Sequence, residues 1–167
     1  MFNIKYLLLY IFIIIMVKHW GPCTWILFHT LAEKVKEETF HLIKTELLNI
    51  IIAICHNLYC PECTAHAKNK LKTLRKDKIL VKEDLKKVLW SFHNSVNVRT
   101  KKKIFNYEEL NEKYKNEKLV NVINKFLEIW NMKNTNPNMI ADNFHRKKVV
   151  SEFKKWIQVN KEKFNFD

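Results

Sequence analysis

The sequence predicts an all-α protein. Glycine occurs once and proline three times among 167 residues, so the chain carries few turn signals. Alternation of apolar and polar residues is scarce, whereas long segments place apolar residues three and four positions apart. The length suits one domain with a substantial core, or one small domain with an extension.

The chain starts with an apolar segment. Residues 6–17 carry no charge and, as a helix, would span about 18 Å, which is short of the ~30 Å hydrocarbon core of a membrane. No small-residue cleavage site follows, which argues against a cleaved signal peptide. Three interpretations of residues 4–17 stay open: an uncleaved membrane anchor, a buried helix, or a false start upstream of a true initiator at Met16.

Apolar periodicity then predicts four helices, followed by a helical extension. The four helices cover residues 24–36, 42–57, 60–72 and 82–100. A short amphipathic piece (105–114), a clear helix (119–130), a polar turn (131–143) and a last helix capped by Asp142 or Asn143 come after them. We divide the chain into an apolar segment (1–18), a domain (19–115) and an extension (116–167). The apolar stripes of the extension need a partner: the preceding helices, a second subunit or a client.

The net charge of +13 is mostly lysine, scattered among acidic residues. Such scatter is typical of solvated helix faces, whereas a nucleic-acid footprint would be clustered and richer in arginine. We therefore expect no nucleic-acid partner. The charge can still favour a phosphate-bearing cofactor.

The motif Cys60-Pro61-Glu62-Cys63 carries the chemistry. Proline suits the first turn of a helix, and the positive end of the helix dipole favours thiolate over thiol, so this pair can act as a redox dithiol. Counting Cys55 and His66 with it would give four zinc ligands, but ligands three apart on one helix do not easily converge on a tetrahedral ion. We expect no metal site. No βαβ alternation supports a thioredoxin-like fold.

Three ordered motifs surround and include this pair. W-G-P-x-x-W-x-x-x-H starts at Trp20, C-P-x-C-x-x-H starts at Cys60, and H-N-x-V-N starts at His93. Together they resemble the Erv/ALR family of FAD-dependent sulfhydryl oxidases, over roughly residues 20–105. The resemblance implies a four-helix bundle that binds FAD, with Cys63 next to the flavin and Cys60 as the outer cysteine. The cofactor-binding residues that it implies are Trp20, Gly21, Trp25, His29, His66, His93, Asn94, Asn97, Arg99 and Lys102, the last two facing the phosphates.

The sequence departs from the cellular members of the family at two places. Lys101 and Lys103 stand where those members have Gly and Pro, and Trp90 and Tyr107 stand where they have a structural disulfide. We expect the aromatic pair to replace the disulfide by packing. The remaining cysteines, Cys23 and Cys55, are expected to be free and buried. In lacking these features, the chain resembles the short forms of the family carried by large DNA viruses.

The activity implied by the resemblance is disulfide formation in client proteins, with electrons passed to O₂ to give hydrogen peroxide. Client dithiols, O₂ and a second copy of the chain are the expected partners. A viral protein in host cytoplasm or virion is the expected setting, and the mitochondrial intermembrane space is the alternative. Two competing functions stay open: a flavin-free thiol-binding adaptor of the same fold, and a small zinc-binding or nucleic-acid-binding protein.

Overall fold

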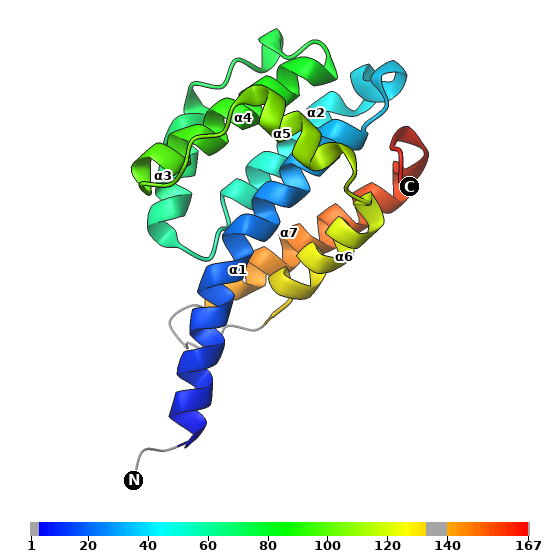
Figure 1. Cartoon of the computed structure of the whole chain (residues 1–167). Coiled ribbons are helices and arrows are strands. Elements are labelled where there is room, and N and C mark those ends of the chain that lie inside the picture. The colour runs from blue at the N-terminus through cyan, green and yellow to red at the C-terminus, as the bar shows by residue number, and fades with distance from the viewer. Residues whose placement is uncertain (1–3, 133–139, 167) are drawn as a thin grey trace.

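A computed structural model describes residues 4–132 and 140–166, with side chains for 19–132 and 142–166. The described chain is helical, without named strands, which confirms the all-α prediction (Figure 1). Its helices are α1 (Ile4–Lys34), α2 (Glu37–Cys55), α3 (Pro61–Lys72), α4 (Lys82–Arg99), α5 (Tyr107–Lys115), α6 (Leu119–Trp130) and α7 (Ile140–Val159), with 3₁₀ turns η1 (Lys76–Lys78) and η3 (Lys161–Lys163).

Helix α1 combines the apolar segment and the first predicted helix. It runs without a break through Gly21 and Pro22, although Pro22 has no amide hydrogen to donate to the preceding turn. In Figure 1 its N-terminal part projects beyond the rest of the molecule. Across the described residues, no helix is both long enough and apolar enough to cross a membrane.

The C-terminal helices pack against the first two helices of the same chain. Helix α6 lies along α1, and α7 contacts α2 and α6. The Trp130 indole donates to Thr24 Oγ1 at 3.1 Å, and the Trp156 indole donates to Glu46 Oε2 at 2.8 Å. The apolar stripes of the extension therefore find a partner in α1 and α2, and they share one buried core with them.

The prediction for the start of the last helix is wrong. Helix α7 begins at Ile140, so Asp142 lies inside its first turn and Asn143 follows, and neither can be its N-cap. A carboxylate in the first turn still interacts favourably with the helix dipole. Much of the predicted polar turn, residues 133–139, lies outside the described residues.

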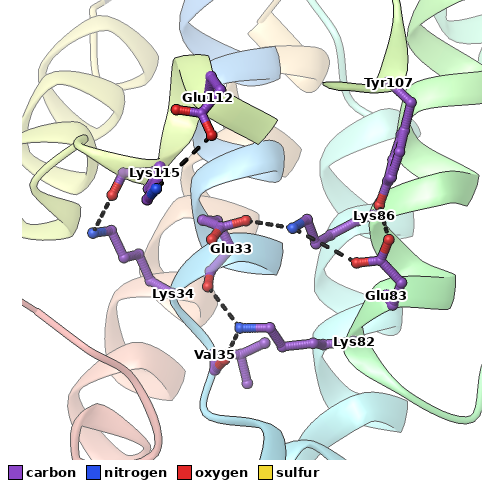
Figure 2. Close-up of polar contacts among 9 residues, drawn as sticks. All are labelled: Glu33, Lys34, Val35, Lys82, Glu83, Lys86, Tyr107, Glu112 and Lys115. Carbon is purple, nitrogen blue, oxygen red and sulfur yellow. Dashed lines mark hydrogen bonds and ion pairs between the residues drawn. The ribbon is translucent and has the colours of Figure 1, made fainter. Parts of the chain in front are cut away.

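Lysine side chains fasten the end of α1 to α4 (Figure 2). Lys82 Nζ donates to the carbonyls of Glu33 (3.0 Å) and Val35 (3.2 Å), which are among the last carbonyls of α1 and the turn after it. Lys86 Nζ lies 2.6 Å from Glu33 Oε2, in a largely buried ion pair. These bonds satisfy carbonyls that a helix end leaves without partners, and they set the position of α4 along α1.

The Trp90–Tyr107 pair and Lys101, both noted in the sequence, have clear structural roles. The rings of Trp90 and Tyr107 pack edge to face at 5.8 Å between centroids, as expected for a pair that replaces a disulfide. Lys101 adopts a left-handed conformation (φ 55°) just after α4. The amides of Lys101 and Lys102 donate to the carbonyls of Val98 and Asn97, the bonding pattern of a Schellman turn. That conformation favours glycine, so Lys101 adopts it at some cost.

Candidate functional site

A cavity of about 540 Å³ lies among α1, α3, α4 and α5. This volume is in the range of cofactor sites. The predicted site residues that line it are Trp20, Gly21, Trp25, Cys63, His66, His93, Asn97, Arg99 and Lys102. Three others lie outside the lining: Cys60 is bonded to Cys63, His29 lies behind His93, and Asn94 holds a neighbouring loop.

One wall of the cavity is aromatic. The Trp25 indole and the His93 imidazole stack at 4.2 Å between centroids, 5° from parallel. His29 Nε2 lies 3.0 Å from His93 Nδ1, so one imidazole donates a hydrogen bond to the other. Helix α1 places Trp25 and His29 one turn apart, and α4 supplies His93. The wall can stack against a planar ring, with His29 fixing the orientation of His93.

Both imidazoles are neutral at physiological pH. Burial, with His93 and then Lys113 adding smaller effects, lowers the pKa of His29 to about 3. Burial lowers the pKa of His93 to about 4, helped by the charges of Lys113 and Lys102. Neutral rings can share a proton in a hydrogen bond without charge repulsion.

These shifts predict how stability depends on pH. Both histidines have folded pKa values below the unfolded value of about 6.5, so between about pH 6.5 and pH 4 protons bind preferentially to the unfolded chain. The contribution of these two histidines to the free energy of unfolding should be constant above pH 7 and fall by about 2 kcal/mol for each of them at pH 5. Urea unfolding at both pH values measures this. His93→Gln should remove part of the loss, and an equal pH dependence in the variant and the unaltered protein would contradict the prediction.

An amide at the cavity wall is buried and unpaired. Asn97 is 4% exposed, and its Nδ2 has no hydrogen-bond partner among the described residues. Leaving a buried amide donor without an acceptor costs about 1–3 kcal/mol of stability. We therefore expect a polar ligand atom to accept a hydrogen bond from Asn97 Nδ2. Asn94 is different: its side chain donates to the carbonyl of Phe105 (2.9 Å) and accepts from its amide (3.0 Å). It fixes the loop that carries the Phe105 ring to the cavity.

A disulfide-bonded cysteine pair borders this cavity. Cys60 and Cys63 form a disulfide, with Cα atoms 5.1 Å apart. Cys60 is the N-cap of α3, and its sulfur accepts a hydrogen bond from the Cys63 amide at 3.1 Å. Of the two, Cys63 lines the cavity. When a disulfide at a helix N-terminus is broken, the positive end of the helix dipole stabilises the thiolate that forms there.

Basic side chains surround the opening. Arg99 Nη1 pairs with Glu62 at 2.8 Å, and its Nη2 lies 3.9 Å from Cys63 Sγ. The guanidinium therefore sits beside the inner sulfur, where a cation favours the thiolate. Lys102 and Lys103 line the cavity beyond it. A ligand with phosphate groups fits this rim.

Two residues that line the cavity belong to a segment in which the sequence showed no motif. Lys113 and Tyr114 of α5 border the cavity, and the Tyr114 ring stacks on His29 at 4.9 Å. Helix α5 reaches the site because it packs against both α1 and α4. Its spacing alone predicts an amphipathic helix, so no local signal in the sequence pointed to this role.

The other two cysteines are free and buried, as predicted. Burial raises the pKa of Cys23 to about 11 and that of Cys55 to about 12. Thiols that stay protonated are poor nucleophiles, so both behave as small apolar residues. Within the described ranges, no three metal-ligating side chains gather at one point.

Comparisons with known proteins agree with this site. The model of the Erv1/Alr family matches residues 22–115, which hold the cavity and the redox pair. The chain belongs to the Erv1/Alr family. It is 34% identical over 103 residues to a protein of African swine fever virus (isolate Warthog/Namibia/Wart80/1980) named FAD-linked sulfhydryl oxidase, covering 59% of this chain and 78% of that one. The same-named protein of isolate Tick/Malawi/Lil 20-1/1983 is 32% identical over 110 residues, 63% and 87% of the two chains. No solved structure matches the chain significantly.

Proposed function

We propose that this chain is an FAD-dependent thiol oxidase. In this proposal it forms disulfides in client proteins through Cys60 and Cys63, and it passes the electrons to O₂, giving hydrogen peroxide. The names of its viral relatives support the class of reaction. The observation that carries the proposal is that Cys63, half of a disulfide-bonded pair, borders the same cavity as the aromatic wall and the unpaired Asn97 amide.

The residues around the cavity fit FAD. The stacked pair Trp25 and His93 offers an aromatic face to a planar ring, and the Asn97 amide offers a donor to a ring or ribose oxygen. Lys102 and its basic neighbours suit the phosphates. Bound FAD would supply the acceptance of two electrons from a dithiol and their transfer to O₂. Gly21 and His66 would contact the cofactor from α1 and α3.

The protein's own part is thiol–disulfide exchange. A client thiolate attacks Cys60 Sγ, and the electron pair of the broken bond leaves on Cys63 as a thiolate beside Arg99. A second client thiolate then displaces Cys60 from the mixed disulfide. The client gains a disulfide, and the pair becomes a dithiol. Arg99 would keep the inner sulfur ionised at the cavity edge, where the two electrons of the dithiol are to leave.

The absorption spectrum of the purified protein tests the proposal. We expect the bands of oxidised flavin, their bleaching by dithiothreitol without air, and their return with O₂ as hydrogen peroxide forms. A colourless protein would instead support the thiol-binding adaptor. Stoichiometric metal lost to a chelator would support the zinc-binding alternative.

The relatives and the resemblance support a proposal for the setting and the assembly of this chain. Since the similar proteins are viral, we propose that this chain is a viral protein that acts in the host cell. We also keep the prediction of a homodimer, which sedimentation equilibrium would test. Host cytoplasm, virion and mitochondrial intermembrane space can be separated by fractionating infected cells.

A further inference from the structure

The residue before the redox pair is held by the C-terminal helices. Tyr59 lies in the turn between α2 and α3, directly before Cys60. Its hydroxyl faces three carbonyls at the end of α6: Trp130 at 3.1 Å, and Ile129 and Met132 at 3.4 Å. The one hydroxyl hydrogen therefore always has an acceptor on α6 or just after it.

The Tyr59 ring is held as firmly as its hydroxyl. The guanidinium of Arg146, on α7, lies 4.4 Å from the ring centroid, and Arg146 is only 2% exposed. A cation over an aromatic ring is attracted to it more strongly when both are shielded from water. The Trp130 ring packs edge to face at 5.7 Å, and the Trp20 ring lies at 6.3 Å. Tyr59 is thus contacted from α1, α6 and α7.

Other polar contacts of this turn are local. The Asn57 side chain donates to the carbonyl of Ala53 (2.8 Å) one turn earlier, and Thr64 donates to the carbonyl of Leu58 at 3.5 Å. Among the polar side-chain contacts described for residues 56–60, those of Tyr59 alone reach a distant part of the chain. The extension therefore supplies the long-range polar contacts of the turn that precedes Cys60.

We propose that Tyr59 and Arg146 are positioning residues, through which α6 and α7 hold the Cys60–Cys63 pair against the cavity. The inference rests on the proposed function. During exchange a client thiolate breaks the bond between the two sulfurs, and Cys60 is then tied covalently to the client. With the cross-link between the two sulfurs broken, the turn keeps its place through its backbone and its non-covalent contacts. The extension would thus keep Cys63 in place while Cys60 is bonded to the client.

The test uses two variants and a matched control on the full chain. Tyr59→Phe removes the hydroxyl and keeps the ring, and Arg146→Gln removes the cation. Trp156→Phe removes another hydrogen bond between extension and bundle, to Glu46 and away from the redox pair. For each protein we would measure FAD content, anaerobic flavin reduction across dithiothreitol concentrations, and deuterium exchange of the amides of residues 56–63.

Both variants should keep FAD and the half-saturating dithiothreitol concentration, but reduce flavin about tenfold more slowly at saturation, since small misplacements of reacting groups cost that much or more. Exchange of the turn should be several-fold faster, and the control should match the unaltered protein. Unaltered rates and exchange in both variants would overturn the proposal, as would equal slowing in the control. If the unaltered chain binds no FAD, the proposed function fails, while the exchange measurement still decides whether the turn is held in this way.

Discussion

Cys63→Ser should abolish the reduction of bound flavin by dithiols, lowering the rate at least about a thousandfold. Serine cannot form a disulfide with Cys60, and its hydroxyl is not ionised at neutral pH, so both the exchange step and the delivery of electrons at the cavity edge are lost. FAD should stay bound, because the aromatic wall and the Asn97 amide are untouched. Stopped-flow absorbance under nitrogen, with FAD content from the denatured supernatant, measures both quantities.

The matched control is Cys23→Ala. Cys23 is buried and free, and its raised pKa keeps it protonated. The rate of flavin reduction should be nearly unchanged in this variant. Turnover that persists in Cys63→Ser would show that another group delivers the electrons, and the role given to Cys63 would have to be abandoned.

Asn97→Leu should weaken FAD binding about ten- to a hundredfold without unfolding the protein. Leucine keeps the side-chain volume but removes the buried donor, so the ligand oxygen that it serves would lose its partner, at about 1–3 kcal/mol. The unliganded protein should be as stable as before or slightly more so, because the unpaired Nδ2 is gone. Fluorescence titration of the apoprotein with FAD gives the dissociation constant, and urea unfolding gives the stability.

Asn124→Ala is the control, since Asn124 is exposed on α6 and does not line the cavity. It should bind FAD like the unaltered chain. An unchanged dissociation constant in Asn97→Leu would remove Asn97 from the cofactor site and weaken the case that this cavity holds FAD.

The three motifs predicted residues that the fold brings together around one cavity. Cys63, Trp25, His93 and Asn97 line one cavity, although they come from three helices. Motif spacing could not show that His29 does not line the cavity itself but is hydrogen-bonded to His93, which does. Helical periodicity puts Trp25 and His29 on one face, but which of them meets the cavity depends on how far α4 lies from α1.

Arg99 shows the same limit. The resemblance predicted that Arg99 faces the cofactor phosphates. In the fold its Nη1 lies 2.8 Å from Glu62 Oε1 of α3, and the guanidinium lies beside Cys63. A long flexible side chain at a helix end can reach several partners, and the nearest charge on the neighbouring helix selects among them.

By itself the sequence determined most of the helical segments, the cysteine motif and the family, because periodicity and short motifs are local properties of the chain. Only the tertiary structure decided what the C-terminal helices do. Their apolar stripes would suit any apolar surface, since burial is not directional. Packing on α1 and α2 brings Trp130 and Arg146 to Tyr59, and so joins the extension to the turn that carries Cys60.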